Sequence, residues 1–229
     1  MMGGIQRCTE PRHKPPHTGH MLDPDPTAEI IRASACRRTR WKNGGGETME
    51  IAIAPAGASL DDFDWRISMA IVASDGPFSV FAGVDRTICI LDGAGIRLAI
   101  DAEPARELNM TSAPLPFSGD AAAHSTLIDG VATDFNVMTR RDRFRHRVER
   151  IRLEAGDVRE VDADVRGVFC QSGVVSVETP HGRERLEPRD TMLRSQSEDR
   201  PWRVHAEDAA TVCLVTISAL HSESLHQEN

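Results

Sequence analysis

In residues 64–73 every second side chain from Trp65 to Ile71 is large and apolar, a pattern that predicts a β-strand with two different faces. One face carries Trp65, Ile67, Met69 and Ile71, and the other carries Arg66, Ser68, Ala70 and Val72. The turn residues Asp75-Gly76-Pro77 end the run. A strand with a continuous apolar face must pack that face against a second layer. We therefore expect an all-β chain built from packed sheets.

The rest of the chain consists of short strand-like runs separated by turn residues. Strands are expected at residues 29–33, 48–54, 86–91, 96–100, 133–139, 147–153, 165–170, 174–178, 186–193 and 210–217. The glycine-containing turns at 92–95 and 171–173 each predict a β-hairpin, and 103–110 predicts one turn of helix. Each hairpin leads on to a turn that ends in aspartate, Asp120 and Asp190 respectively. Such a repeat of short strands favours two jelly rolls.

Charge and composition exclude several classes of protein. The formal net charge of −8 argues against a general nucleic-acid binder, which needs a basic face. No apolar run approaches the ~20 residues that a membrane span needs. The five cysteines form no CxxC pair, and the first 25 residues contain no apolar signal-peptide core. These features favour the reducing cytoplasm.

The chain divides into four predicted segments. Residues 1–27 are rich in proline and histidine and poor in apolar side chains, so we expect a disordered N-terminal extension, with Met21 as an alternative initiator. The spacing of His13, His17 and His20 also suggests a metal site, but an unfolded tail explains it as well. Residues 28–128 are expected to form the first barrel, 129–220 the second, and 221–229 a disordered tail.

The most distinctive motif is a glycine-rich loop. It reads Trp41-Lys42-Asn43-Gly44-Gly45-Gly46-Glu47-Thr48. Consecutive glycines permit positive φ, and their N–H groups can form an anion-binding nest. Lys42 would add charge and Trp41 a packing face. The alternative is a plain connection between two strands. The loop is not a P-loop, because GxxxxGK[ST] is absent.

Two strands carry polar pairs that share a face. Arg66 and Ser68 form one pair, and Asp134 and Asn136 form the other. If these faces line a barrel interior, Arg66 needs a carboxylate partner, since an isolated buried charge is costly, and Glu50 and Asp85 are the candidates. The alternative is that both faces meet solvent. The basic run that contains Arg143, Arg145, His146 and Arg147 is interpreted as solvated surface.

The sequence lacks the usual signatures of metal and nucleophilic catalysis. No HxH pair occurs, and the histidines of residues 28–220, which are His124, His146, His181 and His205, are isolated in sequence. GxSxG, GxGxxG and Cys–His signatures are also absent. We therefore expect no metal, no cofactor and no catalytic residues.

Four segments together resemble the HutD/Ves family. They are residues 40–51 (RWKNGGGETMEI), 64–86, 116–120 and 134–141, and the resemblance spans about residues 28–220. It implies an all-β, cupin-like bicupin, with two small jelly-roll β-barrels in one chain. It also implies a link to histidine utilisation or, in the Ves branch, to stress responses. This chain has Phe81-Ala82-Gly83 where the family usually has Phe-Pro-Gly, a change that loosens the turn.

The motifs and the resemblance together define the expected ligand site. Its residues are Trp41, Lys42, Asn43, Gly44, Gly45, Glu50, Arg66, Ser68, Phe78, Asp85, Arg86, Asp120, Asp134 and Asn136. Lys42, Arg66 and Arg86 would receive a carboxylate, because guanidinium groups bind carboxylates through two parallel hydrogen bonds. The expected ligand is a small carboxylate metabolite of the formylglutamate type.

Three functions remain open at this point. The first is a metal-free binding protein that regulates histidine utilisation. The second is a metal-independent enzyme acting on a histidine-derived acid, with Glu50 or Asp85 as general base. The third is a stress-related interaction protein with an empty barrel. The expected partners are the small carboxylate and a second copy of the chain through sheet edges, with no nucleic acid and no membrane.

Overall fold

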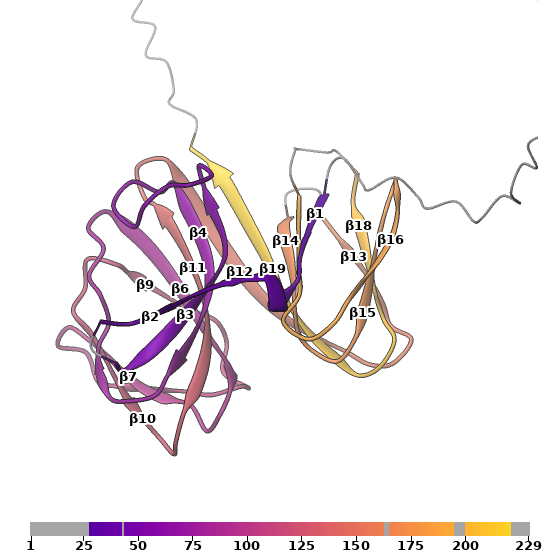
Figure 1. The fold of residues 1–229 in the computed structure, drawn as a ribbon. Helices are drawn as coiled ribbons and strands as arrows, with labels where there is room; N and C mark the ends of the chain where they lie inside the picture. Colours follow the sequence, from indigo (N-terminus) through magenta and orange to yellow (C-terminus); the bar gives the residue numbers. More distant parts are fainter. Residues whose placement is uncertain (1–27, 43, 163–164, 195–199, 221–229) are drawn as a thin grey trace, which may run out of the picture.

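The computed structural model describes residues 28–42, 44–162, 165–194 and 200–220 (Figure 1). Nineteen strands and one short 3-10 helix, η1 (Ala33–Ala35), occur in these residues. The first strands are β1 (Ala28–Ile31), β2 (Arg37–Arg40), β3 (Gly46–Ala54), β4 (Trp65–Val72), β5 (Gly76–Pro77), β6 (Val84–Asp92), β7 (Ile96–Ile100), β8 (Arg106–Leu108), β9 (Leu115–Ser118) and β10 (Ala123–Leu127). The remaining strands are β11 (Ala132–Arg140), β12 (Phe144–Leu153), β13 (Val158–Val161), β14 (Val165–Ser172), β15 (Val175–Thr179), β16 (Gly182–Leu186), β17 (Thr191–Arg194), β18 (Trp202–Ala206) and β19 (Ala210–Ala219). The prediction of an all-β chain is confirmed.

The strands form two pairs of sheets. The first sheet pair consists of a six-stranded sheet, β2-β3-β4-β11-β6-β9, and a four-stranded sheet, β5-β10-β7-β8. Its apolar core joins side chains of both sheets, including Ile88, Ile90, Ile96 and Leu98. The second sheet pair consists of β1-β17-β14-β19-β12 and β13-β18-β15-β16. Its core includes the fully buried Trp202. Two packed antiparallel sheets in each half agree with the expected cupin-like architecture.

A third apolar cluster joins the two sheet pairs. It lies between the six-stranded sheet and the β1-β17-β14-β19-β12 sheet. At its centre the rings of Phe135 and Phe169 stack, with centroids 4.5 Å apart. Arg150 of the second pair adds polar contacts, donating hydrogen bonds to the carbonyls of Met110, Ser112 and Ile90. The two sheet pairs therefore share buried apolar surface. Separating them would expose that surface to water, so we expect them to unfold together.

The strand pairing divides the chain differently from the predicted boundary at 128/129. Strand β11 lies beyond that boundary, yet it pairs with β4 and β6 in the first sheet pair. Strand β1 precedes the whole first sheet pair but pairs with β17 of the second, and Figure 1 shows the chain crossing from β1 to β2. Such pairing is non-local, so alternation within one strand carries no signal for it. The predicted segments 1–27 and 221–229 lie outside the described residues.

Both predicted hairpins are wrong in the same way. The turn at 92–95 joins β6 to β7, but β6 belongs to the six-stranded sheet and β7 to its four-stranded partner. The turn at 171–173 likewise joins β14 and β15, which lie in different sheets. Gly95 has a φ of +110°, and a Cβ there would lie 2.0 Å from the carbonyl oxygen of Leu108. These glycines therefore form corners between sheets, where backbone segments approach closely.

Two further local predictions are corrected. No helical turn forms at 103–110, where β8 pairs with β7 instead. The strand expected at 186–193 is split, because residues 187–190 form a turn between β16 and β17. Pro188 has no N–H to donate to a ladder, and Arg189 has a φ of +74°, which a strand does not accommodate.

Candidate functional site

Four predicted residues share the interior face of the six-stranded sheet. Ser68 lies directly opposite both Glu50 and Asn136, and Asp134 lies opposite Ala70 and Ile90. Directly opposite residues of antiparallel strands project to the same face. Ile90 belongs to the core of the first sheet pair, so this face points inward. The side chains of Ser68, Asp134 and Asn136 are 3%, 2% and 7% exposed, which rules out the solvent-facing alternative.

Arg86 enters the same interior inside an aromatic cage. Its guanidinium carbon lies 5.4, 5.7 and 4.9 Å from the ring centroids of Phe78, Phe81 and Phe117. One Nη donates a hydrogen bond to the carbonyl of Ser79, whereas Nε is buried without a hydrogen-bond partner. Burial lowers the pKa of Arg86 to about 10, and the charge of Asp134 partly opposes that shift. The side chain therefore remains cationic near neutral pH.

The carboxyl group of Asp134 has a strongly raised pKa. Burial raises its pKa to about 7, while the positive charge of Arg86 and a hydrogen bond from Asn136 act in the opposite direction. Asp134 and Arg86 influence each other electrostatically but form no direct ion pair. One carboxyl oxygen, Oδ1, is buried without a hydrogen-bond partner. The group can therefore carry or release a proton near pH 7.

Arg66 is held in place by Glu50. Its Nε lies 2.9 Å from a carboxylate oxygen of Glu50, and the Arg66 side chain is largely buried. Arg66 is close enough to Arg86 that its charge contributes to lowering the pKa of Arg86. The expected carboxylate partner of Arg66 is thus Glu50 rather than Asp85. Together the cluster contains two guanidinium groups, two carboxyl groups, an amide and a hydroxyl.

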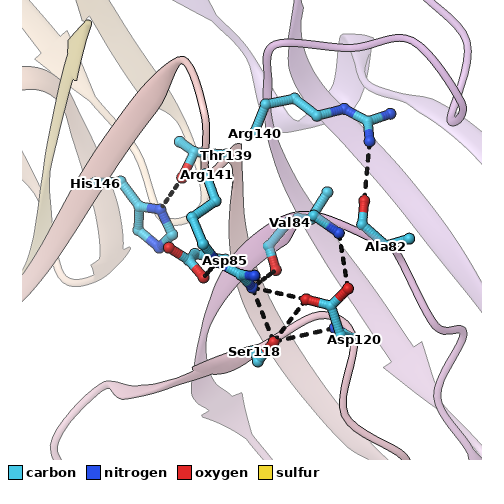
Figure 2. A network of polar contacts seen from close by, with 10 residues as sticks. Ala82, Val84, Asp85, Ser118, Asp120, Thr139, Arg140, Arg141 and His146 are labelled. Atoms are coloured by element: carbon cyan, nitrogen blue, oxygen red, sulfur yellow. Dashed lines mark hydrogen bonds and ion pairs between the residues drawn. The ribbon is translucent and has the colours of Figure 1, made fainter. Parts of the chain in front are cut away.

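Asp85 and Asp120, also predicted to bind ligand, instead hold Arg141. The Arg141 guanidinium donates to Asp85 at 2.7 Å and to Asp120 and the hydroxyl of Ser118 at 2.8 Å, as Figure 2 shows. The N–H of Gly83, Arg141 and Ser118 together lower the pKa of Asp120 to about 2. Both carboxylates are half exposed. This network links Arg141, which follows β11, to Asp85 of β6 and Ser118 of β9. Both carboxylates are therefore paired with Arg141 rather than free to bind a ligand.

The glycine loop is a tight connection between β2 and β3. Trp41 accepts a hydrogen bond from the N–H of Gly44 and donates its own N–H to the carbonyl of Gly46. The indole N–H donates to the hydroxyl of Thr48 at 2.8 Å. Lys42 is exposed, and the carbonyl of Gly45 accepts from Ala73. This geometry favours the strand-connection interpretation over the anion nest. The remaining loop residue, Asn43, lies outside the described residues.

Gly46 allows the indole to lie against the sheet, which leads to a prediction. A Cβ at this position would lie 2.2 Å from the carbonyl oxygen of Ile71 and 3.1 Å from the Trp41 ring. We expect Gly46→Ala to lower the free energy of unfolding by about 2 kcal/mol, as overpacked sites do. Thermal denaturation followed by circular dichroism measures it. Gly76→Ala is the matched control, since nothing lies within 4 Å of its Cβ position. Equal stability of the two variants would contradict this explanation.

His146 was predicted to lie on a solvated basic surface, and that prediction is wrong. Its Nδ1 lies 2.7 Å from the hydroxyl of Thr139, seen in Figure 2, and its Nε2 lies 2.9 Å from the hydroxyl of Thr87. Burial lowers its pKa to about 4. The ring thus joins β12 of the second sheet pair to β6 and β11 of the first. Alternation in β12 places it inward while Arg145 and Arg147 remain exposed.

Two surface hollows lie away from the interior cluster. A hollow of about 470 Å³ lies beside Arg32, Arg185 and Asp190, and one of about 120 Å³ lies beside Arg147 and Arg159. Neither is lined by a predicted ligand residue. Within residues 28–42, 44–162, 165–194 and 200–220, no three His, Cys, Asp or Glu side chains gather in a manner suited to a metal ion. The same residues contain no helix that could span a membrane.

Comparisons with known proteins agree with the motif resemblance. The sequence profile of the HutD family matches residues 33–214. A 21.2 kDa protein from the hutC 3′ region of Pseudomonas putida is 40% identical over 53% of this chain and 63% of its own length. Protein Ves of Citrobacter koseri is 40% identical over 47% of this chain and 56% of its own length. The structure of HutD from Pseudomonas fluorescens, in a formate condition, has a TM-score of 0.72 and 30% identity, covering 85% of this chain and 100% of that one.

The curated relatives are matched only in part. The aligned segments span 63% and 56% of the lengths of the two relatives, which is under two thirds in both cases. The family profile, in contrast, covers most of the chain, including every cluster residue of the interior.

Proposed function

Since the chain belongs to the HutD family, which links it to the histidine utilisation locus, we propose that it is a metal-free bicupin that binds a small carboxylate inside the first sheet pair. Binding would serve a regulatory role in histidine utilisation. The observation that carries the proposal is Arg86, a buried cation whose Nε–H has no hydrogen-bond partner. A carboxylate is the group that best satisfies a guanidinium.

The surroundings of Arg86 support an anionic ligand rather than a permanent internal partner. The charge of Asp134 raises the pKa of Arg86 without an ion pair between the two, and Glu50 is paired with Arg66. Three phenylalanine rings exclude water from the guanidinium, which strengthens any charge-assisted hydrogen bond formed there. The P. fluorescens relative was studied in a formate condition, and formate is the smallest carboxylate.

The location of the protein is a separate part of the proposal. The four described free cysteines support a reducing compartment, so we propose that the protein is cytoplasmic.

A thermal-shift screen tests this function. The protein is heated with histidine, urocanate, formylglutamate, glutamate or formate. A ligand at ~100 times its Kd stabilises the fold by roughly 2.7 kcal/mol, which raises Tm by several degrees for a chain of this size. We expect at least one of the acids to do so, and Arg86→Met to abolish the shift. Arg106→Met, which removes an exposed arginine of the same sheet pair, should retain it. No shift with any of the acids would contradict the proposal.

A second candidate function, acid–base catalysis on the same class of ligand, is favoured by one observation. Asp134 has a pKa of about 7 because of its burial, which suits a general acid or base at neutral pH. Glu50 and Asp85, the bases expected from sequence, are instead paired with Arg66 and Arg141. Incubation with formylglutamate followed by NMR tests this function. Product formation that Asp134→Asn abolishes would favour the enzyme over the binding protein.

A further inference from the structure

Two cysteine thiols meet across the interface between the two sheet pairs. Cys89 lies on β6 of the first pair and Cys213 on β19 of the second, and both belong to the apolar cluster that joins the pairs. The thiol of Cys89 is hydrogen-bonded to the sulfur of Cys213. Both residues are buried, with 2% and 0% of their surface exposed. The contact therefore joins two side chains that are far apart in sequence and lie on different halves of the molecule.

The strand register brings the two thiols to this point. Cys89 lies directly opposite Phe135 of β11, and Cys213 lies directly opposite Phe169 of β14. Directly opposite residues of antiparallel strands project to the same face of a sheet. The rings of Phe135 and Phe169 stack across the interface, with centroids 4.5 Å apart. The cysteine beside each ring consequently projects into the same interface, so backbone pairing fixes the contact between the thiols.

Arg150 makes Cys213 the more acidic of the two thiols. It lies directly opposite Cys213 on the neighbouring strand β12. The hydrogen bond from Cys89 and the charge of Arg150 lower the pKa of Cys213, although burial opposes them. The same hydrogen bond between the thiols, together with burial, raises the pKa of Cys89. The Nε–H of Arg150 is buried without a hydrogen-bond partner, and a thiolate at Cys213 would give it an acceptor.

This arrangement has the features of a redox-active cysteine pair. The thiolate is the nucleophile in reactions with peroxides, and a nearby cation stabilises it. Oxidation of a cysteine stays reversible when a second thiol can condense with the oxidised sulfur to form a disulfide. The other two described cysteines contact only backbone carbonyls: Cys170 that of Gly173, and Cys36 that of Arg32. Among the cysteines that the structure describes, the combination of a second thiol and a cation therefore occurs at one place.

We propose that Cys89 and Cys213 are a redox couple that a hydroperoxide converts into a disulfide bridge between the two sheet pairs. With hydrogen peroxide, the Cys213 thiolate attacks one oxygen and the O–O bond breaks. A sulfenic acid forms, and the leaving hydroxide takes up the proton that Cys213 released. The sulfur of Cys89 then attacks the Cys213 sulfur, the S–O bond breaks, and the second hydroxide takes the proton of Cys89. Two thiols are oxidised to one disulfide while one peroxide is reduced to two waters.

The bridge would fasten the interface in its closed arrangement. Buried thiols meet peroxide only when the sheet pairs separate locally, so the reaction depends on such openings. Once formed, the bridge prevents further separation. It also closes a long loop, which reduces the conformational freedom of the unfolded chain. Exchange with a dithiol reductant reverses the reaction, as is typical of the transient disulfides found in reducing compartments.

Peptide mapping after oxidation tests the proposal. The reduced full-length protein is treated with hydrogen peroxide, its remaining thiols are alkylated under denaturing conditions, and the peptides are identified by mass spectrometry. We expect one dominant cross-link, which joins Cys89 to Cys213 and lacks the two hydrogens of the thiols. Cys170→Ser removes another buried thiol of the second sheet pair and should leave this cross-link unchanged. Alkylation of both Cys89 and Cys213 after oxidation, or separate oxygen adducts on them without a cross-link, would overturn the proposal.

Thermal denaturation tests whether the bridge fastens the sheet pairs. We expect the Tm of the oxidised protein to exceed that of the reduced protein by about 5 °C or more, and dithiothreitol to restore the lower Tm. Peroxide should not raise the Tm of Cys213→Ser. The comparison within the wild-type protein remains decisive if this variant folds poorly. A cross-linked protein whose Tm is unchanged or lower would contradict the fastening role.

Trapping of the sulfenic acid tests which sulfur reacts first. In Cys89→Ala the oxidised Cys213 has no second thiol to condense with, so dimedone should label it. In Cys213→Ser the remaining thiol of Cys89 lacks the hydrogen bond that favours a thiolate at Cys213, and we expect much weaker labelling. Equal labelling of Cys89 and Cys213 in the two variants would contradict the role given to Arg150.

Discussion

Phe135→Ala is expected to lower the free energy of unfolding by about 4 kcal/mol, which is the usual cost of emptying a fully buried phenylalanine site. Phe135 of β11 is completely buried and stacks on Phe169 of β14. The lost ring therefore removes both transfer energy and an aromatic contact that joins the two sheet pairs. The cavity would open between two packed sheets, where neither can collapse without disturbing its own hydrogen-bond ladder.

Urea denaturation followed by tryptophan fluorescence and circular dichroism measures this effect. Val80→Ala is the control, because its side chain is 58% exposed and the change should stay within about 0.5 kcal/mol. We expect a single transition in the wild-type protein, since Trp65 packs in the shared cluster and Trp202 lies in the core of the second sheet pair. A loss below about 1 kcal/mol in Phe135→Ala would show that the sheet pairs do not share a core.

Asp134 is expected to make the protein less stable as the pH rises from about 4 to 8. Its folded pKa is about 7, against about 3.9 for an aspartate in an unfolded chain. Between these values the folded protein binds more protons than the unfolded chain, so the free energy of unfolding falls with increasing pH. Three pH units correspond to about 4 kcal/mol for a fully buried group. The stability contributed by the protonated form is complete below about pH 4 and is lost as the pH passes 7.

Asp134→Asn isolates this contribution. The substituted amide does not titrate, so the stability difference between wild-type protein and variant should shift in favour of the variant by about 3 to 4 kcal/mol between pH 4 and pH 8. Urea denaturation at each pH gives the values. Asp85→Asn is the control, because it changes a half-exposed carboxylate that pairs with Arg141 and leaves Asp134 in place, so the contribution of Asp134 to the pH dependence of stability should remain. Parallel curves for wild type and Asp134→Asn would mean that Asp134 is ionised at neutral pH.

The strands and their faces could be predicted from sequence because they are local properties. The alternation in residues 64–73 correctly assigns Trp65, Ile67 and Met69 to one packed face and Ser68 to the other. The same logic correctly grouped Asp134 with Asn136. What alternation cannot show is which strands pair across long stretches of chain. The membership of β1 and β11, and the use of glycine turns as corners between sheets, depend on such long-range pairing.

The sequence could name most residues of the interior cluster, but it could not show which side chains contact one another. Arg86 was predicted as an anion receptor, yet its cage comes from Phe78, Phe81 and Phe117, which are spread over forty residues and meet only in the folded sheets. Asp85 and Asp120 resemble ligand contacts in sequence, but Arg141 satisfies both. The sequence around an aspartate does not show whether its carboxylate is paired with a cation of the protein or is free to bind a ligand.

The most direct test of the account observes the Nε–H group of Arg86 by NMR. The protein is labelled with ¹⁵N-arginine, and the Arg86 signal is assigned by its loss in Arg86→Met. If a carboxylate binds inside the first sheet pair, titration with glycolate or formate shifts the Arg86 Nε–H resonance until saturation, because the group gains its missing hydrogen bond. The exposed Arg106 signal should not move. An Arg86 resonance that stays fixed while the ligand binds, with another arginine shifting instead, would contradict the central claim.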